Sequence, residues 1–254
     1  MSEPMPITFT SHEFQPRCFA LVPCAGVGER AGAGGPKQYH PVAGRSVVAH
    51  TLAALQSVPR LTATLVVLSP ADDQFERHAP DFVGERAWVA RVGGATRAES
   101  VRNGLSELLS RGAQPHDWVL VHDAARCLLR PEWVQRLIDA CGDDEVGGLL
   151  ALPLADTLKA ATAGGEGEPR ARQTVDRTAK WAAQTPQMFR LGLLQPALVS
   201  ALSDPVSAAA VTDEASAVEM LGHAPRLVTG DFENIKVTWP GDFALAQRFL
   251  ATRT

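Results

Sequence analysis

A glycine-rich stretch near the N-terminus carries the residues most able to do chemistry in this sequence. It spans residues 21–38 and contains Gly26 and Gly28 together with two cations, Arg30 and Lys37. Glycine has no side chain, so backbone N–H groups in such a stretch approach an anion closely. An apolar run, residues 18–22, leads into the stretch and predicts a buried strand. Strand, glycine loop and fixed positive charge together predict a phosphate-binding loop.

Two common phosphate-binding motifs do not fit this loop. A P-loop has Gly-Lys followed by Ser or Thr, whereas Lys37 lies between Pro36 and Gln38. The dinucleotide fingerprint G-x-G-x-x-G also fails, because the gap between Gly28 and Gly32 is one residue too long. An ordinary glycine-rich surface turn is the alternative, and it would make the two cations and the preceding strand a coincidence.

Three further polar motifs follow or lie on predicted strands. They are Gly93-Gly94-Ala95-Thr96-Arg97, His122-Asp123-Ala124-Ala125-Arg126 and Asn234-Ile235-Lys236-Val237-Thr238. In an open parallel sheet, ligands bind beyond the carboxyl ends of the strands. We therefore expect these motifs to gather around the glycine loop.

Asp123 is the best candidate for a metal ligand, because four apolar residues and His122 precede it and should end a buried strand there. Mg²⁺ binds hard oxygens and usually takes one or two carboxylates plus substrate phosphates. A helix cap is the alternative role for Asp123, and Glu233 is a weaker second carboxylate. His122 lies one residue earlier and so on the opposite face, where we expect a packed, hydrogen-bonded histidine and no catalytic base.

The apolar pattern supplies the elements that must position these motifs. Strands are expected at 18–22, 64–68, 88–92, 118–122, 147–152, 226–228 and 235–238, and helices at 46–56 and 191–201 and from about 97, 131, 212 and 242. Ser46, Thr212 and Asp242 are the expected N-caps of their helices. Strands that alternate with helices predict an α/β fold, with a Rossmann-like, mostly parallel, twisted sheet and helices on both faces.

The alternation breaks between about residues 154 and 186. Two extended segments, 156–159 and 173–177, flank a glycine-rich turn over 163–169, which predicts a protruding hairpin. Such an arm has few core contacts and usually needs something to pack on, so we expect it to reach another subunit. A mobile surface flap is the alternative.

Length and composition fit one globular domain. With 254 residues, we expect a disordered tail over 1–16 and a single domain over 17–254, with the hairpin as an insertion. The net charge of −4 argues against nucleic-acid binding. The four cysteines form no C-x-x-C pair, which argues against a zinc site or a disulfide framework and favours a reduced, cytoplasmic compartment. No secretory signal and no membrane-length apolar stretch is found, so no membrane partner is expected.

Taken together, the motifs resemble those of a known enzyme family. A strand followed by Ala-Gly-x-Gly-x-Arg and then Pro-Lys resembles the sugar-type nucleotidyltransferases. The full set resembles the 2-C-methyl-D-erythritol 4-phosphate cytidylyltransferase family of the non-mevalonate isoprenoid pathway, in the family's order over roughly residues 17–251. The matching pieces are Pro23 to Gly26, Lys37-Gln38-Tyr39, Gly93-Gly94-x-x-Arg97-x-x-Ser100-Val101, Val121 to Arg126, Asp156-Thr157, Thr174 to Arg177, Thr185-Pro186-Gln187, Thr212-Asp213-Glu214 and Asn234 to Thr238.

The resemblance implies an α/β nucleotidyltransferase that acts as a homodimer through a β-arm. Its reaction transfers CMP from CTP to the 4-phosphate of the sugar alcohol and releases pyrophosphate, with Mg²⁺ or another divalent cation as cofactor. Two anions must meet in such a reaction, so positioning and electrostatic stabilisation are the main demands on the protein.

The loop chemistry and the resemblance together assign roles to named residues. The expected CTP-binding residues are Cys24, Ala25, Gly26, Gly28, Arg30, Lys37, Gly94, Ser100 and Asp123, and Asp123 is also the metal ligand. The expected acceptor-binding residues are Asp123, Arg126, Thr157, Arg177, Thr212 and Lys236, with Thr157 and Arg177 supplied by the partner's arm. The expected catalytic residues are Arg30, Lys37, Arg177 and Lys236. For Ser100, an ordinary helix-face serine is the alternative.

Three other functions are weighed against this one. A cytidylyltransferase for another polyol phosphate, such as ribitol 5-phosphate, would share most of the motifs. A non-catalytic CTP sensor would bind CTP without releasing pyrophosphate, and Arg30, Lys37, Asp123 and Lys236 disfavour it. An oxidoreductase is disfavoured by the glycine spacing. The sequence ends after one nucleotidyltransferase unit, so we expect a monofunctional enzyme without a cyclodiphosphate synthase domain.

Overall fold

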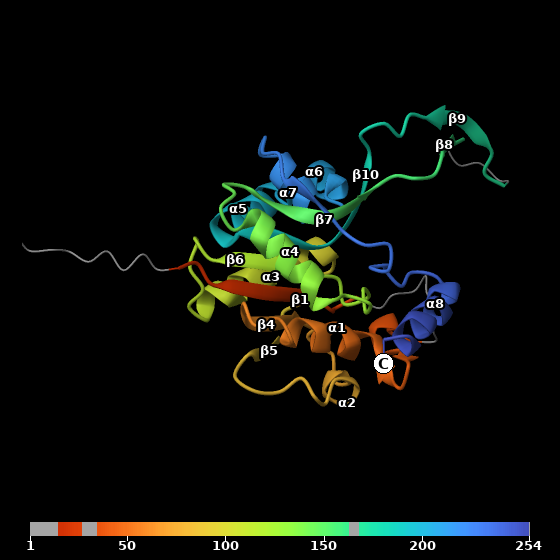
Figure 1. Ribbon diagram of the computed structural model, residues 1–254. Helices are drawn as coiled ribbons and strands as arrows, with labels where there is room; N and C mark the ends of the chain where they lie inside the picture. Colours follow the sequence, from red (N-terminus) through yellow and green to blue (C-terminus); the bar gives the residue numbers. More distant parts are fainter. Residues whose placement is uncertain (1–14, 27–34, 163–167, 254) are drawn as a thin grey trace, which may run out of the picture.

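A seven-stranded mixed sheet forms the centre of the computed structural model, which describes residues 15–26, 35–162 and 168–253 (Figure 1). The strands, in their order across the sheet, are β11 (Arg226–Thr229), β7 (Gly147–Pro153), β10 (Trp181–Arg190), β6 (Trp118–Val121), β1 (Cys18–Pro23), β4 (Leu61–Val67) and β5 (Ala87–Ala90). Neighbours pair in parallel except β10, which runs antiparallel to both β6 and β7. The predicted α/β class with a mostly parallel sheet is confirmed.

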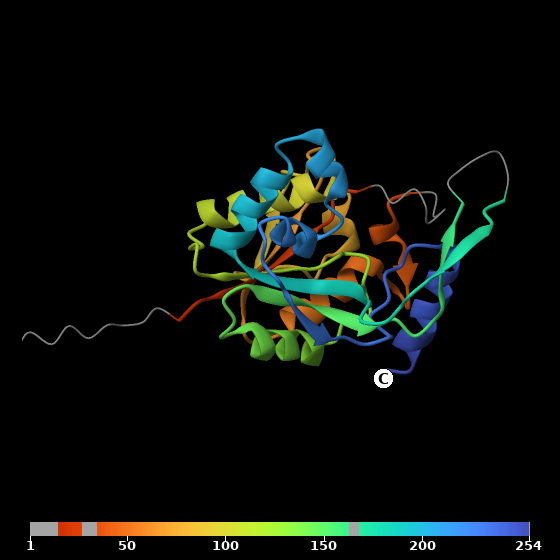
Figure 2. The ribbon, with the colours of Figure 1, turned by 90° about the horizontal axis from the view of Figure 1, so that it is seen from above.

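Helices cover both faces of this sheet, as expected (Figure 2). One face packs against α1 (Val47–Gln56) and α4 (Pro131–Cys141). The other face packs against α3 (Arg97–Ser110), α5 (Leu191–Ala201) and α7 (Glu214–Glu219). Short helices α2 (Phe75–His78) and α6 (Pro205–Ala210) lie in the connections.

The central strand β1 shows why this arrangement forms. Its residues are apolar and buried on both sides, as expected for a strand covered by helices on each face. Because side chains alternate along a strand, Phe19 and Leu21 join the core under α3, whereas Ala20 and Val22 join the core under α1. The carboxyl end of β1 leads directly into the glycine-rich loop.

Strand β10 is the main element that the sequence did not predict. It occupies a central position in the sheet, although its residues include Gln184, Thr185, Pro186 and Gln187. Its pairing with β7 is interrupted between Ala183 and Gln187, so the proline and its polar neighbours fall in a break of the ladder. Proline normally avoids central strands, and the break is what accommodates it.

The expected strand at 235–238 is wrong. This segment, between β11 and α8 (Pro240–Ala251), has no regular secondary structure. Val237 is buried in a small cluster with residues of α8, and its N–H donates to Ala125 O at 2.9 Å. The alternation of apolar residues in this segment therefore reflects packing under α8 and does not indicate a strand.

Two of the three predicted helix caps are also wrong. Ser46 caps α1 as expected, with its Oγ accepting from Ala49 N–H at 3.2 Å. The cap of α7 is Asp213 and not Thr212, because the Asp213 carboxylate accepts from Ser216 N–H at 2.9 Å. Asp242 lies inside the first turn of α8, where its carboxylate accepts from Thr238 N–H and Trp239 N–H, both at 2.8 Å.

Outside the main sheet, two small antiparallel pairs complete the fold. Strands β2 (Pro41–Val42) and β3 (Arg45–Ser46) follow a single turn of 3₁₀ helix, Lys37–Tyr39. Strands β8 (Leu158–Ala161) and β9 (Ala171–Val175) form the predicted hairpin, which projects from the body of the molecule (Figures 1 and 2). From Trp181 onward the chain belongs to the central sheet, so the hairpin strands end earlier than residue 186.

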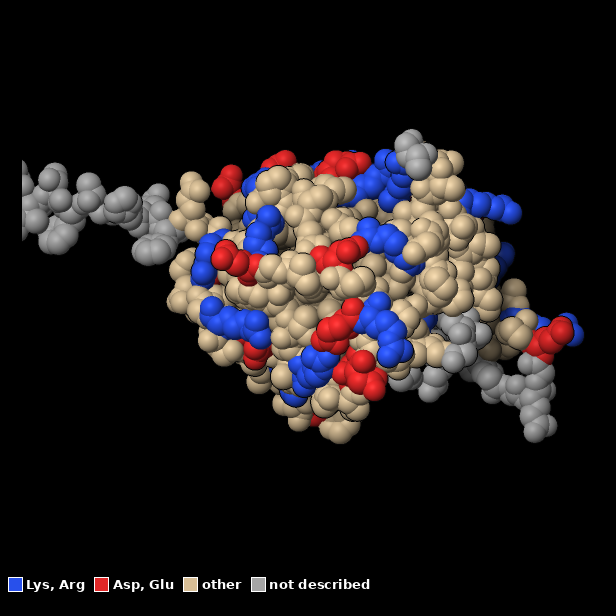
Figure 3. Space-filling view, turned by 90° about the horizontal axis from the view of Figure 1, so that it is seen from below, with Lys and Arg blue, Asp and Glu red and all other residues tan. Residues whose placement is uncertain are grey.

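The surface and the helix lengths add two observations. On the face drawn in Figure 3, basic and acidic side chains are interspersed. Helix α3, with 14 residues, is shorter than the roughly 20 residues that a bilayer span requires. None of the helices in the described ranges has the length and apolarity to cross a membrane.

Candidate active site

A pocket of about 280 Å³ opens at the carboxyl ends of β1, β5 and β6. It lies where an open parallel sheet is expected to bind ligands. Its lining includes most of the predicted CTP-binding residues, namely Cys24, Ala25, Gly26, Lys37, Gly94, Ser100 and Asp123, and also Lys236, which was predicted to bind the acceptor. The structure therefore brings together motifs that are separated by more than 200 residues in the sequence.

A second pocket, of about 230 Å³, adjoins the first one. Arg126 and Thr212, both predicted to bind the acceptor, line it. Arg97, Asp123 and Lys236 line both pockets and so form a shared wall. Two adjacent pockets with charged residues between them suit a reaction that joins two anionic molecules.

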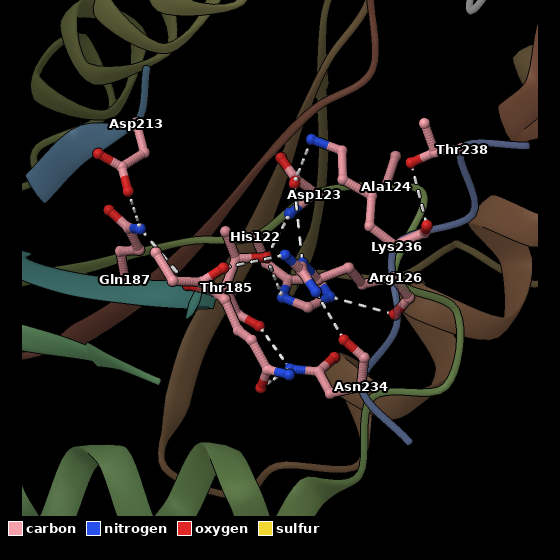
Figure 4. A network of polar contacts seen from close by, with 12 residues as sticks. His122, Asp123, Ala124, Arg126, Thr185, Gln187, Asp213, Asn234, Lys236 and Thr238 are labelled. Atoms are coloured by element: carbon pink, nitrogen blue, oxygen red, sulfur yellow. Dashed lines mark hydrogen bonds and ion pairs between the residues drawn. The ribbon is translucent and has the colours of Figure 1, made fainter. Parts of the chain in front are cut away.

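Asp123 is the centre of the shared wall (Figure 4). Its Oδ1 accepts from Arg97 Nε at 2.8 Å, its Oδ2 lies 2.8 Å from Lys236 Nζ, and Arg126 Nε is 3.8 Å away. Burial alone raises the pKa of the Asp123 carboxyl, but the three cations outweigh burial and hold that pKa far below its usual range. Asp123 is therefore ionised at physiological pH and holds three positive groups in place.

Arg97 and Glu214 complete this charge network, and the sequence reasoning gave neither of them a role. Arg97 Nη1 and Nη2 donate to the two carboxylate oxygens of Glu214 at 2.6 and 3.1 Å. The Glu214 side chain is only 1% exposed, and burial raises its pKa while Arg97 opposes that shift. The two residues start different helices, 117 positions apart, so no sequence spacing signals the pair.

Gly94 and Ser100 form one wall of the first pocket. Gly94 N–H donates to Ser100 Oγ at 3.1 Å, and Ser100 Oγ–H donates to Thr96 O at 2.9 Å. A side chain at residue 94 would come within 2.4 Å of Glu99 Cβ, so this close approach requires glycine. Ser100 is buried and faces the pocket, which rules out a solvent-exposed serine on the surface of α3.

The start of the glycine-rich loop is held from the side by Gln38. The Gln38 Nε2 amide donates to Cys24 O at 3.2 Å and to Gly26 O at 2.9 Å. Lys37, the neighbouring residue, donates from Nζ to Val237 O at 3.0 Å and so reaches the segment that carries Lys236. Burial raises the pKa of the Cys24 thiol, which therefore stays protonated and uncharged at physiological pH.

His122 is packed below the site, as the sequence predicts. Its Nδ1 lies 3.1 Å from Thr185 Oγ1 and its Nε2 lies 3.3 Å from Arg126 O. Burial lowers the pKa of His122 to about 4, so the ring is neutral at physiological pH. The prediction of a packed, hydrogen-bonded histidine is confirmed.

Among the described residues, two carboxylates line the pockets: Asp123 lines both, and Asp213 lines the second one. Across the described residues, no group of three or more His, Cys, Asp or Glu side chains could hold a metal ion. Asp123 lines both pockets, whereas Glu233 pairs with Arg130 and Arg253 at 2.8 and 3.0 Å and lines neither pocket. Asp123 fits Mg²⁺ as a carboxylate ligand beside phosphate oxygens of a bound nucleotide.

Four predicted site residues remain to be placed. Gly28 and Arg30 lie outside the described residues. Thr157 and Arg177 are exposed on the segments that flank the hairpin strands, and they line neither pocket. Within one chain the structure does not bring these two arm residues to the acceptor pocket.

Comparison with known proteins agrees with this geometry. A family model for 2-C-methyl-D-erythritol 4-phosphate cytidylyltransferase matches residues 18–252. The chain is 57% identical over 235 residues to the 2-C-methyl-D-erythritol 4-phosphate cytidylyltransferase of Laribacter hongkongensis, a match that covers 92% of this chain and 96% of that protein. It is 53% identical over 249 residues to the bifunctional enzyme IspD/IspF of Albidiferax ferrireducens, covering 98% of this chain and 56% of that longer protein.

A solved structure supports the same assignment. The crystal structure of a 4-diphosphocytidyl-2C-methyl-D-erythritol synthase superposes on this chain with a TM-score of 0.78 at 42% identity. The match covers 92% of this chain and 98% of that one. Fold, site motifs and relatives thus agree, and the chain belongs to the 2-C-methyl-D-erythritol 4-phosphate cytidylyltransferase family.

Proposed function

We propose that this chain transfers CMP from CTP to 2-C-methyl-D-erythritol 4-phosphate, which gives 4-diphosphocytidyl-2-C-methyl-D-erythritol and pyrophosphate. The observation that carries the proposal is the pair of adjoining pockets with a shared wall of Arg97, Asp123 and Lys236. The first pocket is lined by the start of the glycine-rich loop, up to Gly26, and by Lys37 for a nucleotide, and the second by Arg126 and Thr212 for a phosphorylated acceptor. The family to which the chain belongs supplies the identity of both substrates.

In this reaction an oxygen of the acceptor phosphate attacks the α-phosphorus of CTP in line with the departing pyrophosphate. A new P–O bond forms at the α-phosphorus, and its bond to the oxygen that bridges to the β-phosphate breaks. The electron pair of the broken bond leaves with pyrophosphate. The attacking phosphate is already ionised at neutral pH, so no general base is required.

The obstacle is repulsion between two polyanions, and positioned cations remove it. We assign Lys37 and Lys236 to the α-phosphate and Arg30 to the departing pyrophosphate. Lys236 also orients the attacking phosphate, since it lines both pockets. Asp123 holds Lys236 at 2.8 Å and Arg97 at 2.8 Å, so these cations need little reorganisation during the reaction.

Recognition of cytosine is assigned to the wall of the first pocket. Cytosine differs from uracil by an exocyclic amine, which is a hydrogen-bond donor and needs an acceptor. Cys24, Ala25, Gly94 and Ser100 line the pocket there, and we assign this recognition to backbone atoms and the Ser100 hydroxyl. The glycine loop, with Gly26 and Gly28, holds the triphosphate through backbone N–H groups.

A divalent cation, Mg²⁺ or another, is proposed as the cofactor. When bound, it would offset charge on the triphosphate, with Asp123 as its carboxylate ligand and phosphate oxygens as its other ligands.

The acceptor site is proposed to be completed by a second subunit. The hairpin β8–β9 projects from the body, and its residues are largely exposed in the single chain. An arm of this kind is expected to pack on a partner. We assign Thr157 and Arg177 of the partner's arm to the acceptor phosphate, beside Arg126 and Thr212 of this chain.

The four cysteines of the chain, Cys18, Cys24, Cys127 and Cys141, are free and buried, which supports a reducing cytoplasmic location.

One assay tests the function directly. Pyrophosphate release from CTP is measured with 2-C-methyl-D-erythritol 4-phosphate, with ribitol 5-phosphate and without an acceptor. The proposal expects release with the first acceptor at a kcat/KM well above that for the second. A preference for ribitol 5-phosphate would reassign the acceptor, and CTP binding without release in any mixture would identify a nucleotide sensor.

A further inference from the structure

The segment that carries Lys236 has no secondary structure to hold it. It runs from Gly230 to Trp239, between β11 and α8. A lysine side chain is long and flexible, so its ammonium group is positioned only as well as its backbone is. For a group that must contact the oxygens of a reacting phosphate, a misplacement of about 1 Å costs up to about 100-fold in rate. Whatever fixes this segment therefore controls the reaction proposed above.

The amide side chain of Gln184 fixes one end of the segment. Its Nε2 donates to Asp231 O at 2.8 Å, and its Oε1 accepts from Asp231 N–H at 3.4 Å. The same Oε1 accepts from Asn234 Nδ2 at 3.3 Å. Gln184 therefore contacts the segment at two residues, the second of which is two positions before Lys236.

Asn234 extends this anchor to strand β10 and to the active site. It is fully buried, and its Nδ2 donates to Thr185 O at 2.9 Å. Its carbonyl oxygen accepts from Arg126 Nη1 at 2.6 Å. Figure 4 shows Asn234 below Thr185 and Arg126, with Lys236 directed towards Asp123. Strand β10 thus anchors the irregular segment on the side opposite α8.

Two features of the chain are arranged around the Gln184 amide. The ladder between β10 and β7 is interrupted after Ala183, so Gln184 is not needed for regular pairing. Gly230 packs against it so closely that an added Cβ would lie 2.2 Å from Gln184 Oε1. A side chain at residue 230 would displace the amide. The glycine therefore keeps the space in which Gln184 makes its contacts.

Gln184 also lines the second pocket. We propose that it is a positioning residue for Lys236, acting through Asp231 and Asn234, and that it takes no part in the reaction itself. The inference rests on the proposed function, because it requires Lys236 to act on the phosphates. It predicts that disturbing the Gln184 amide lowers activity by misplacing Lys236. The same disturbance should lower activity much less once Lys236 has been removed.

The test is a double-mutant cycle on kcat/KM for pyrophosphate release. Gln184→Met removes all three hydrogen bonds of the amide at similar volume, and Gly230→Ala displaces the amide while leaving Gln184 itself unchanged. Each is made in the natural sequence and in the Lys236→Ala background. We expect each to lower kcat/KM at least about tenfold in the natural sequence and less than about twofold in the Lys236→Ala background.

A matched control comes from the opposite end of the sheet. Asp117 is a buried side chain that fixes a loop, accepting from Arg17 N–H at 2.9 Å and Gln114 N–H at 2.8 Å. Asp117→Asn should lower thermal stability and change kcat/KM by the same small factor in both backgrounds. This variant shows how much kcat/KM changes when an anchor with only a structural role is weakened.

The outcomes are distinct. Equal losses for Gln184→Met and Gly230→Ala in both backgrounds, or no loss in the natural sequence, would overturn the positioning role. If Gln184→Met does not fold, Gly230→Ala decides alone, because it leaves the buried amide in the chain. Near-normal turnover of Lys236→Ala by itself would remove the role of Lys236 in the proposed reaction, which is a separate failure.

Discussion

Asp123 determines the charge balance at the residue scale. One buried carboxylate is surrounded by Arg97, Arg126 and Lys236, and a further cation, Lys37, lines the same pocket. The described part of the site thus holds more positive than negative charge, which suits two phosphorylated substrates. The sequence singled out Asp123 and Lys37 after predicted strands and Lys236 on an expected strand that does not form, and the family resemblance implied the roles of the two lysines. It could not identify Arg97 as the partner of Glu214, because that contact depends on how two helices pack.

Removal of either lysine should show the size of their contribution. We expect Lys37→Ala and Lys236→Ala each to lower kcat/KM by at least about 100-fold, the scale of one lost preorganised electrostatic contact. Arg60→Ala, which removes a cation paired with Asp139 on the surface, is the control and should leave kcat/KM unchanged. Steady-state pyrophosphate release measures all three. Near-normal turnover in either lysine variant would refute the role of that lysine.

His122 should make the stability of the protein depend on pH. The pKa of His122 is lowered to about 4 in the folded chain, whereas an unfolded histidine has a pKa of about 6.5. Between these values the unfolded chain binds a proton that the folded chain does not. The free energy of unfolding should therefore fall as the pH drops from 6.5 towards 4, by up to about 1.4 kcal/mol per pH unit from this group.

The variant His122→Asn isolates this contribution. Denaturant unfolding at pH 7, 6 and 5 should give a flatter pH dependence for the variant than for the natural sequence. Burial also lowers the pKa of His50, which contributes equally to both proteins and cancels in the difference. The same slope in both proteins would mean that His122 takes up its proton in the folded chain.

At the scale of elements, the sequence predicted the helices and strands that have a regular apolar pattern. It missed the elements that polar contacts hold in place. Helices α1, α3 and α4 begin within one residue of where the sequence placed them, because a side-chain cap (α1 and α3) or Pro131 (α4) coincides there with the start of an apolar stripe. Strand β10 escaped notice because Gln184, Thr185 and Gln187 look like loop residues. In the structure these side chains anchor the segments of Lys236, Asp123 and Asp213, respectively.

The N-terminus of α7 offers a test of one such anchor. Asp213 caps the helix and accepts from Gln187 Nε2 at 2.8 Å, and both Asp213 and the preceding Thr212 line the acceptor pocket. Asp213→Ala should lower the free energy of unfolding by about 1 kcal/mol and should also raise KM for the acceptor, because Thr212 loses its support.

Asp204 provides the matched control, since it caps α6 by accepting from Val206 N–H at 2.9 Å and lines neither pocket of the site. Asp204→Ala should also lower the free energy of unfolding and should leave the acceptor KM unchanged. Chemical denaturation and steady-state kinetics separate the two effects. An unchanged KM in Asp213→Ala would show that the cap of α7 has only a structural role.

At the scale of the whole molecule, the acceptor site is incomplete in one chain under the proposed function. Arg177 and Thr157 lie on the exposed flanks of the arm and away from both pockets. The sequence alone suggested an arm, because two polar, extended segments enclose a glycine-rich turn. It could not show which pocket the arm serves, since that depends on the arrangement of subunits.

Mixing two defective variants answers this question. Arg177→Ala should weaken use of the acceptor more than CTP binding, and Lys236→Ala should lose activity in its own pocket. In a mixed dimer, the Arg177→Ala subunit keeps an intact pocket and receives Arg177 from the other subunit's arm. Free exchange of equal amounts makes half of the dimers mixed, each with one complete site, so about a quarter of the natural activity should return. Arg172→Ala, a change of another exposed arginine on the arm, should need no such rescue. If the arm served its own pocket, neither site of a mixed dimer would be complete and the mixture would stay inactive.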